Sequence, residues 1–200
     1  MTKPLILASS SFARSQMLQA VGLDFRVVPP LDVDESALIS QGLEAGLSFQ
    51  ETCGRVAMHK ALCVARLYPD SWVIGADQIL YDETGIVMKA RSPAEALARF
   101  MAWQGRTHHL CSCACVVTQA EGCVWSGYDE AALTMRVCSE SFLRAYMDRA
   151  GEALCGCVGG YAIEEAGVWL FSDVRGDGFT IRGLPLIGLL SFLVSVGFSP

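Results

Sequence analysis

The feature that most constrains the fold is a short apolar run that leads straight into hydroxyl side chains and a helical pattern. Residues 5–8, LILA, are typical of a buried strand. Residues 12–21 place apolar side chains at helical spacing, and Gly22 follows them as a stop signal. A buried strand joined to a helix by only a few residues is the building unit of α/β proteins. This stretch therefore predicts an α/β fold.

The rest of the chain supports that fold class. Further strands are predicted at residues 25–28, 72–76, 107–118, 123–137 and 168–171, and helices from residue 48 to about 67, from 92 to 104, from 139 to 150 and near the C-terminus. Residues 78–90 resemble a hairpin, and the two long strand-like runs flanking residues 119–122 should pair antiparallel. Because helices alternate with strands before this long hairpin, we expect a mixed sheet within a single domain spanning residues 1–200.

The hydrophobic content, 52% with a mean hydropathy of +0.36, is high enough to raise the question of a membrane. The longest apolar run, residues 183–198, has only 16 residues and contains Pro185 and three glycines. A membrane-spanning helix needs about 20 residues. The apolar stretch at residues 5–8 is also too short for a signal peptide. We therefore expect a cytoplasmic protein with no membrane partner.

The nine cysteines fit the same compartment, because they are odd in number and lie in apolar runs. Cys111, Cys113 and Cys115 alternate and should share one face of a strand, where a free cysteine acts as a small hydrophobe. A zinc site is the alternative, but paired C-x-x-C spacing is absent. The net charge of −6 argues against a nucleic-acid polymer as partner, whereas a small polyphosphate needs only a few local cations.

The three serines after the first strand have two interpretations. Ser11 can simply cap the helix that follows. Alternatively, the hydroxyls and the free backbone N–H groups of the helix N-terminus bind an anion, which the helix dipole favours. Arg14 lies in the first turn, where the dipole disfavours a cation. Since a guanidinium suits phosphate oxygens, its position favours the anion.

Four charged residues interrupt apolar or turn segments elsewhere. Asp77 follows a buried strand, where α/β sheets place ligands, or it forms a turn. Lys60 lies within an apolar helical stripe and binds an anion or extends to solvent. Lys89 follows a strand and binds a ligand or decorates an edge. Glu35, in an acidic stretch, holds a divalent cation or belongs to a solvated loop.

Taken together, these residues match the needs of one reaction. Carboxylates at Glu35 and Asp77 can bind Mg²⁺ and orient water, while Arg14, Lys60 and Lys89 can neutralise charge that develops on phosphates. The sequence therefore predicts hydrolysis of a metal-bound polyphosphate.

The order of the motifs resembles a known family. LILASSSFARSQML, the acidic VDE, RVAMHKA, VIGADQ, VMKA, QGRTHH and GLPL together resemble the Maf family of nucleoside triphosphate pyrophosphatases, also called septum formation inhibitors. The resemblance covers essentially the whole chain. It implies a two-lobed α/β fold like that of inosine triphosphate pyrophosphatases, with a central cleft, and a homodimer. It also implies hydrolysis of a nucleoside triphosphate to the monophosphate and pyrophosphate, with Mg²⁺ or Mn²⁺, to clear non-standard or modified nucleotides.

The resemblance also assigns roles to individual residues. It implies that Asp77 is the catalytic proton acceptor and that Glu35 and Asp77 serve the metal. The remaining family positions, which would contact the substrate, are Ser9, Arg14, Lys60 and Lys89.

Several positions depart from the family pattern and concern the nucleotide base. The positions that the resemblance links to substrate choice are Ala13, Gln78 and Glu164. Relatives carry tryptophan or arginine where this chain has Ala13, so the base is left open. The G-K-P and D-K-A-G motifs are also altered, at residues 88–90 and 155–161. A catalytically weakened, nucleotide-binding regulator of cell division is therefore the alternative function.

Overall fold

We describe a computed structural model of the chain that covers residues 3–151 and 153–199. The chain divides into two compact units. Unit 1 comprises Met1–Gln78, Cys111–Asp129 and Gly178–Pro200, and unit 2 comprises Ile79–Leu110 and Glu130–Asp177. Three long strands, β3, β5 and β6, contribute residues to both units. The elements in chain order are β1 (Leu5–Ala8), α1 (Phe12–Ala20), β2 (Arg26–Val27), α2 (Glu35–Glu44), α3 (Phe49–Ala65), β3 (Trp72–Asp82), β4 (Gly85–Val87), α4 (Pro93–Trp103), β5 (Thr107–Thr118), β6 (Gly122–Met135), α5 (Glu140–Ala150), α6 (Ala153–Gly156), the 3₁₀ helix η1 (Ala166–Leu170), β7 (Phe171–Arg175), α7 (Gly178–Ile181) and α8 (Leu186–Ser195).

The strands of the described residues form one mixed sheet, which confirms the predicted α/β fold class. The order is β2-β1-β3-β5-β6-β7, and β4 pairs with β3. β1 runs parallel to both β2 and β3, whereas β3–β4 and β6–β7 are antiparallel. The parallel pairing of β1 follows from the connections, because parallel neighbours need a crossover and helices lie between these strands, whereas a short turn joins the antiparallel pair β3–β4.

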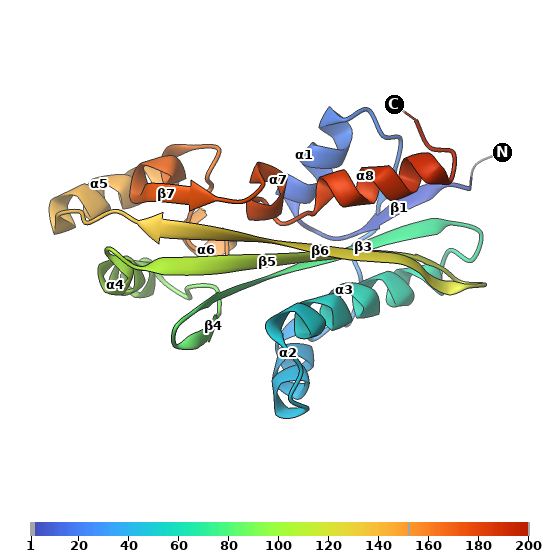
Figure 1. Ribbon diagram of the computed structural model, residues 1–200, viewed down its shortest axis with the longest axis horizontal. Helices are drawn as coiled ribbons and strands as arrows, with labels where there is room; N and C mark the ends of the chain where they lie inside the picture. The colour runs from blue at the N-terminus through green and yellow to red at the C-terminus, as the bar shows by residue number, and fades with distance from the viewer. Residues whose placement is uncertain (1–2, 152, 200) are drawn as a thin grey trace. The chain divides into compact units, whose positions relative to one another are not determined.

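Unit 1 packs helices on both faces of its part of the sheet. Figure 1 shows α1 and α8 over one face and α3 on the other, with α2 beside α3. The core between the sheet and the first pair of helices contains side chains of β1, β3, β5, α1 and α8: Leu5, Leu7, Met17, Leu18, Ile74, Ala76, Ala114, Val116, Leu186, Leu189 and Leu193. The apolar C-terminal run therefore forms a buried helix, as predicted.

The alternation of side chains along a strand decides which residues of β3 face α3. Ile74 and Ala76 belong to the core with α1 and α8, so Gly75 and Asp77 face the other way. Gly75 permits close contact there, because a Cβ atom at this position would lie 2.2 Å from the backbone oxygen of Ala57 on α3. α3 therefore rests directly on the backbone of β3, beside Asp77.

Unit 2 has its own aromatic core. His108 is fully buried and stacks on Trp103 with ring centroids 4.4 Å apart. Its Nε2 atom lies 2.6 Å from the hydroxyl of Tyr161, and burial lowers the pKa of His108 to about 4. Phe100 on α4 packs edge-on against Tyr146 on α5. The cluster joins α4, α5 and β5 in one packed core.

Two predicted strands and one alternative for the acidic stretch differ from the structure. The strand predicted to end before Asp77 continues to Asp82, because the first arm of the predicted hairpin is the same strand. The strand predicted at residues 168–171 begins only at Phe171, and the preceding residues form η1. The acidic stretch, for which a solvated loop is one of the two alternatives above, opens the helix α2, whose N-cap is Asp34.

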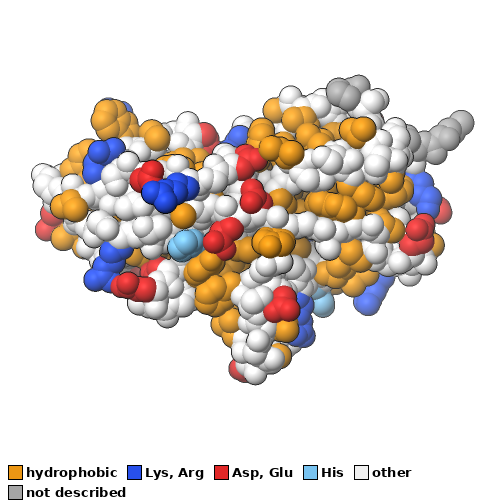
Figure 2. All heavy atoms as spheres, in the orientation of Figure 1, with side chains coloured by type: hydrophobic (Ala, Val, Ile, Leu, Met, Phe, Trp, Pro, Cys, Tyr) orange, Lys and Arg blue, Asp and Glu red, His pale blue; other side chains and the backbone are white. Residues whose placement is uncertain are grey.

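The surface carries charges of both signs. On the face drawn in Figure 2, Lys and Arg side chains are interspersed with Asp and Glu side chains and with apolar ones. None of the described helices combines the length and the apolar character that crossing a membrane requires.

Candidate functional site

Asp77 lies where the parallel pairing of unit 1 ends. The register of β1 with β3 runs from Leu5 opposite Trp72 to Ala8 opposite Gly75, so Asp77 is two residues beyond the last pair. This corrects the expectation that Asp77 follows its strand, and it removes the alternative of a turn-forming aspartate. The carboxylate nevertheless lies just past the carboxyl end of β1, where α/β sheets place ligands.

Lys60 joins the two predicted metal-binding carboxylates. Its Nζ atom lies 2.6 Å from Oδ1 of Asp77 and 2.7 Å from Oε1 of Glu35. The side chains of Lys60 and Asp77 are only 5% and 6% exposed. Lys60 therefore does not extend to solvent, which excludes that alternative. The structure brings together three of the predicted residues in one charged group.

The fixed position of Lys60 follows from the sequence of α3. Ser48 caps this helix and forms a reciprocal capping box with Glu51, as predicted. The direct contact at Gly75 then sets the distance of α3 from β3. Lys60 reaches Asp77 from this helix, and the short distance to the carboxylate is a consequence of the missing side chain at residue 75.

Glu35 reaches the same lysine from α2. Asp34 caps the helix by accepting a hydrogen bond from the backbone N–H of Ala37, and Glu35 is the first helical residue. Gly42, two turns further on, lies against Thr52 of α3, where a Cβ atom would be 2.7 Å from the threonine Oγ1. The glycine lets α2 approach α3. The side chain of Glu35 is 52% exposed, so this carboxylate forms the open side of the group.

Opposing influences act on the acidity of Asp77. Burial raises the pKa of Asp77, and the positive charges of Lys60 and Arg14 act against that rise. The net pKa is higher than that of an ordinary aspartate. A carboxylate with a raised pKa and a buried position holds a transferred proton better than an exposed one, which suits a general base.

The serine stretch divides into a cap and a buried hydroxyl. Ser11 is the N-cap of α1, since its Oγ accepts a hydrogen bond from the backbone N–H of Arg14. Ser9 is 4% exposed, and its Oγ accepts hydrogen bonds from the backbone N–H of Ser11 and from Nη1 of Arg14. The capping interpretation is therefore confirmed for Ser11, whereas Ser9 belongs with Arg14.

Arg14 makes more contacts with the protein than the sequence indicates. Its Nε donates to the carbonyl oxygen of Gly183 at 2.8 Å, and its Nη1 donates to that of Ala76 at 3.0 Å. Ala76 is the residue before Asp77, so the guanidinium is fixed beside the carboxylate. These bonds explain a buried cation in the first turn without a ligand, and they place its charge where it acts on Asp77.

Gln78 anchors α7 to the strands of unit 1. Its Nε2 lies 3.0 Å from Oγ of Ser112, 3.0 Å from the carbonyl oxygen of Thr180 and 3.1 Å from that of Ile181. Two of these acceptors are backbone carbonyls, which only accept, so the amide nitrogen must face them. Ser112 also donates to Thr180. The side chain of Gln78, which the resemblance links to substrate choice, therefore also holds α7 in place.

The other residues linked to the substrate lie in different surroundings. Ala13 is half-buried on α1 in unit 1. Lys89 and Glu164 are both exposed and belong to unit 2. Both lie near Cys157. Burial is the main cause of the raised pKa of the Cys157 thiol, and the charge of Glu164 raises it further whereas that of Lys89 lowers it. Unit 1 therefore carries the predicted catalytic and metal residues, and unit 2 carries these two.

Sequence reasoning missed the residues that position the charged group. Gly75 and Gly42 set the helix contacts, and Ser112, which is fully buried, holds Gln78. A glycine within a strand pattern signals the close approach of another backbone, and this signal was available at Gly75. Ser112 gives no such signal, since it resembles any small residue within a strand.

Fold and site together define a class: an α/β protein with a buried lysine between two carboxylates, beside a parallel strand end. Residues 4–196 match the family model described as Maf-like protein. The chain belongs to the Maf-like protein family, as the motif order predicts.

Curated relatives match over nearly the full length. The chain is 42% identical to a "Nucleoside triphosphate pyrophosphatase" of Granulibacter bethesdensis, over 94% of this chain and 95% of that one. It is 41% identical to a protein of the same name from Caulobacter vibrioides, over 95% and 94% of the two chains. A third, from Rhodopseudomonas palustris, is 38% identical over 96% and 93%.

Similarity to solved structures is weaker. The Staphylococcus aureus Ham1 protein aligns with a TM-score of 0.44 at 15% identity, over 68% of this chain and 72% of that one. This likeness is too distant to add to the fold described above.

Proposed function

We propose that this protein hydrolyses a nucleoside triphosphate to the nucleoside monophosphate and pyrophosphate. The observation that carries the proposal is the buried ammonium of Lys60 between Asp77 and Glu35, at 2.6 and 2.7 Å. The names of the curated relatives, which match almost end to end, support the same reaction. Carboxylates next to fixed cations supply both a proton acceptor and charge neutralisation for a polyphosphate.

Glu35 and Asp77 fit a divalent cation by the chemistry of their donors. Both present carboxylate oxygens, the ligands that Mg²⁺ and Mn²⁺ prefer, and both already converge on a single cation, the Lys60 ammonium. When bound, the metal would neutralise phosphate charge and lower the pKa of a coordinated water. We propose that these two residues hold it, with Glu35 on the open side.

Asp77 is proposed to act as the general base. Water attacks one phosphorus atom of the α–β anhydride, Asp77 takes a proton of that water, the bridging P–O bond breaks, and the nucleoside monophosphate and pyrophosphate are released. The raised pKa of Asp77 favours proton acceptance, while the charges of Lys60 and Arg14 keep it ionised in the resting state. The base is therefore held in its ionised form by fixed neighbours.

Arg14 and Ser9 are proposed to serve this group from the other side. The two hydrogen bonds from Arg14 to backbone carbonyls fix its guanidinium, so its charge does not move during the reaction. A fixed charge stabilises a polyphosphate without the cost of reorganisation. The base of the nucleotide stays open, and Ala13, Gln78, Lys89 and Glu164 are the candidates for contacting the rest of the substrate.

The decisive experiment compares the wild type with Asp77→Asn on a panel of common and modified nucleoside triphosphates with Mg²⁺, measuring pyrophosphate. The substitution removes the base and one metal charge with little change in volume, so we expect a loss of about 100- to 10,000-fold or more. Asp70→Asn, at an exposed turn before β3, is the matched control and should retain activity.

The other possible outcomes of this experiment indicate a different mechanism or a different function. Retained turnover in Asp77→Asn would remove Asp77 from the mechanism. Orthophosphate in place of pyrophosphate would indicate a general phosphatase. Calorimetric binding of a nucleotide by the wild type without any product across the panel would indicate the regulator instead.

A further inference from the structure

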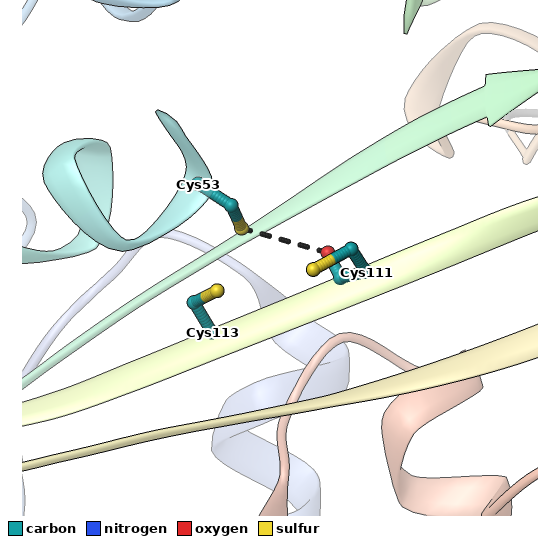
Figure 3. Close-up of side chains that lie close together, drawn as sticks. All are labelled: Cys53, Cys111 and Cys113. Carbon is teal, nitrogen blue, oxygen red and sulfur yellow. Dashed lines mark hydrogen bonds between the residues drawn. The ribbon is translucent and has the colours of Figure 1, made fainter. Parts of the chain in front are cut away.

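Three buried cysteines outside the charged group lie together in unit 1. Cys53 comes from α3, and Cys111 and Cys113 come from β5. Their Sγ atoms all lie within 4.8 Å of one another, and the three residues are 0%, 1% and 3% exposed. Figure 3 shows Cys53 projecting from the helix toward the strand that carries the other two. The proposed reaction uses none of them.

The sequence explains why these side chains meet. Residues two apart on a strand share a face. The opposite face of β5 carries the core residues Ala114 and Val116. Cys111 and Cys113 therefore face α3. The helix is tied to the strand at this point, since the Cys53 thiol donates to the carbonyl oxygen of Cys111 at 3.5 Å and the Cys113 thiol donates to that of Gln50 at 3.5 Å.

We propose that Cys53, Cys111 and Cys113 form a binding site for a soft, thiophilic metal cation of low coordination number, of which Cu⁺ and Cd²⁺ are examples. This site is separate from the carboxylate group and goes beyond the proposed function. It is a three-sulfur site built between one helix and one strand of the same unit, and its ion would be enclosed by the core.

The sulfur positions fit a metal, and the spacing of Cys111 and Cys113 does not favour a disulfide between them. Metal–sulfur bonds of about 2.3 Å place three sulfurs about 4 Å apart around a central ion. The cluster, with all separations within 4.8 Å, would contract by less than about 1 Å to reach that geometry. Two cysteines separated by one residue on an extended strand have Cα atoms about 6.6 Å apart, near the upper limit for a disulfide. A bond between Cys111 and Cys113 is therefore disfavoured.

The donor set selects the kind of metal. Within the described part of the chain, no fourth Cys, His, Asp or Glu joins the three sulfurs. Zn²⁺ in structural sites almost always has four ligands, whereas thiolates favour softer ions such as Cu⁺. Mg²⁺ prefers oxygen donors and would not compete. Three sulfurs without a fourth protein donor thus favour an ion that accepts three ligands.

Metal binding at this cluster is coupled to the loss of protons. A thiolate, not a thiol, is the metal ligand. Binding forms up to three metal–sulfur bonds and breaks as many S–H bonds, the protons pass to the solvent, and no electrons are transferred. The apparent affinity should therefore rise with pH.

The test is direct titration of the full chain with Cd²⁺, in the presence of excess Mg²⁺ and a phosphine reductant, after refolding to give the ion access. We expect one Cd²⁺ per folded chain by native mass spectrometry, a sulfur-to-metal charge-transfer band and a higher unfolding midpoint, because an ion bound only to the native state stabilises it. Separate Cys53→Ala, Cys111→Ala and Cys113→Ala variants should each lower the affinity by about 100-fold or more.

Cys115→Ala is the matched control, since Cys115 is equally buried on β5 but lies outside the cluster. Binding that survives all three cluster substitutions, or that is lost in the control alone, overturns the proposal. If a variant does not fold, cadmium NMR of the wild type decides, because its chemical shift reports the sulfur ligands. Three are expected, and fewer than three, or no bound ion at all, refutes the site.

Discussion

Replacing Lys60 by methionine tests the charged group through its stability. Methionine keeps the length and removes the charge, so the 6%-exposed side chain of Asp77 loses its ion pair and keeps only the weaker influence of the Arg14 charge. Removing one partner of a buried ion pair costs about 3–5 kcal/mol. Glu35, at 52% exposure, returns to water and contributes little. We therefore expect Lys60→Met to lower the free energy of unfolding by about 3–5 kcal/mol, nearly all of it through Asp77.

The double variant Lys60→Met/Asp77→Asn isolates that cause. With the buried charge removed as well, no uncompensated ion remains, and the double variant should recover at least about 2 kcal/mol of the single variant's loss. Urea denaturation at pH 7 measures the free energy of unfolding of the wild type, the single variant and the double variant. Lys3→Met, which removes an exposed lysine, is the control and should change stability by less than about 0.5 kcal/mol.

The stability loss caused by Lys60→Met should also depend on pH. Because the folded state raises the pKa of Asp77, it binds that proton more tightly than the unfolded chain does, and the group's contribution to stability falls as the pH rises past its ordinary value of 3.8. Lys60 is the largest influence opposing the rise, so its loss raises the pKa further. Lys60→Met should therefore be more destabilising at pH 7 than at pH 4. Equal losses at both values, or additive losses in the double variant, would refute the reasoning.

Two further predictions follow from the helix contact and from the donor set. In Gly75→Ala the new Cβ would meet the backbone oxygen of Ala57 at 2.2 Å, so α3 must move away from β3; we expect reduced stability in urea and reduced pyrophosphate release, whereas Gly54→Ala, with nothing within 4 Å, should gain about 1 kcal/mol. Treatment with EDTA should abolish pyrophosphate release, and added Mg²⁺ should restore it; full activity after exhaustive chelation would contradict a metal at Glu35 and Asp77.

Local signals in the sequence were sufficient for most elements. The cap at Ser11, the capping box of Ser48 and Glu51 and the Ser92-Pro93 start of α4 each satisfy backbone groups that a helix end leaves unpaired, so the helix starts could be predicted from single residues. The strand β5 was predicted with its observed bounds because its strand-like run is long and ends at the turn predicted for residues 119–122.

The features that depend on distant residues could not be predicted in this way. The continuation of β3 through Asp77 places the strand beside β5, its neighbour in the sheet, which begins only at Thr107. The contacts of Arg14 with the carbonyls of Gly183 and Ala76 span 169 and 62 positions in the sequence. Local patterns named Arg14 as a cation in an unusual place, but only the fold shows which acceptors surround it.

α3 is the element on which both proposed cation sites depend. Cys53 and Lys60 are seven residues apart, which places them on the same face of the helix, about 10.5 Å apart along its axis. One faces the thiols of β5, and the other faces Asp77 on β3, the next strand in the sheet. The two sites also interact electrostatically. Burial is the main cause of the raised pKa of Cys53, and the charge of Asp77 raises it further. Any change that moves α3 away from Gly75 should therefore weaken metal binding at both the cysteine cluster and the carboxylate group.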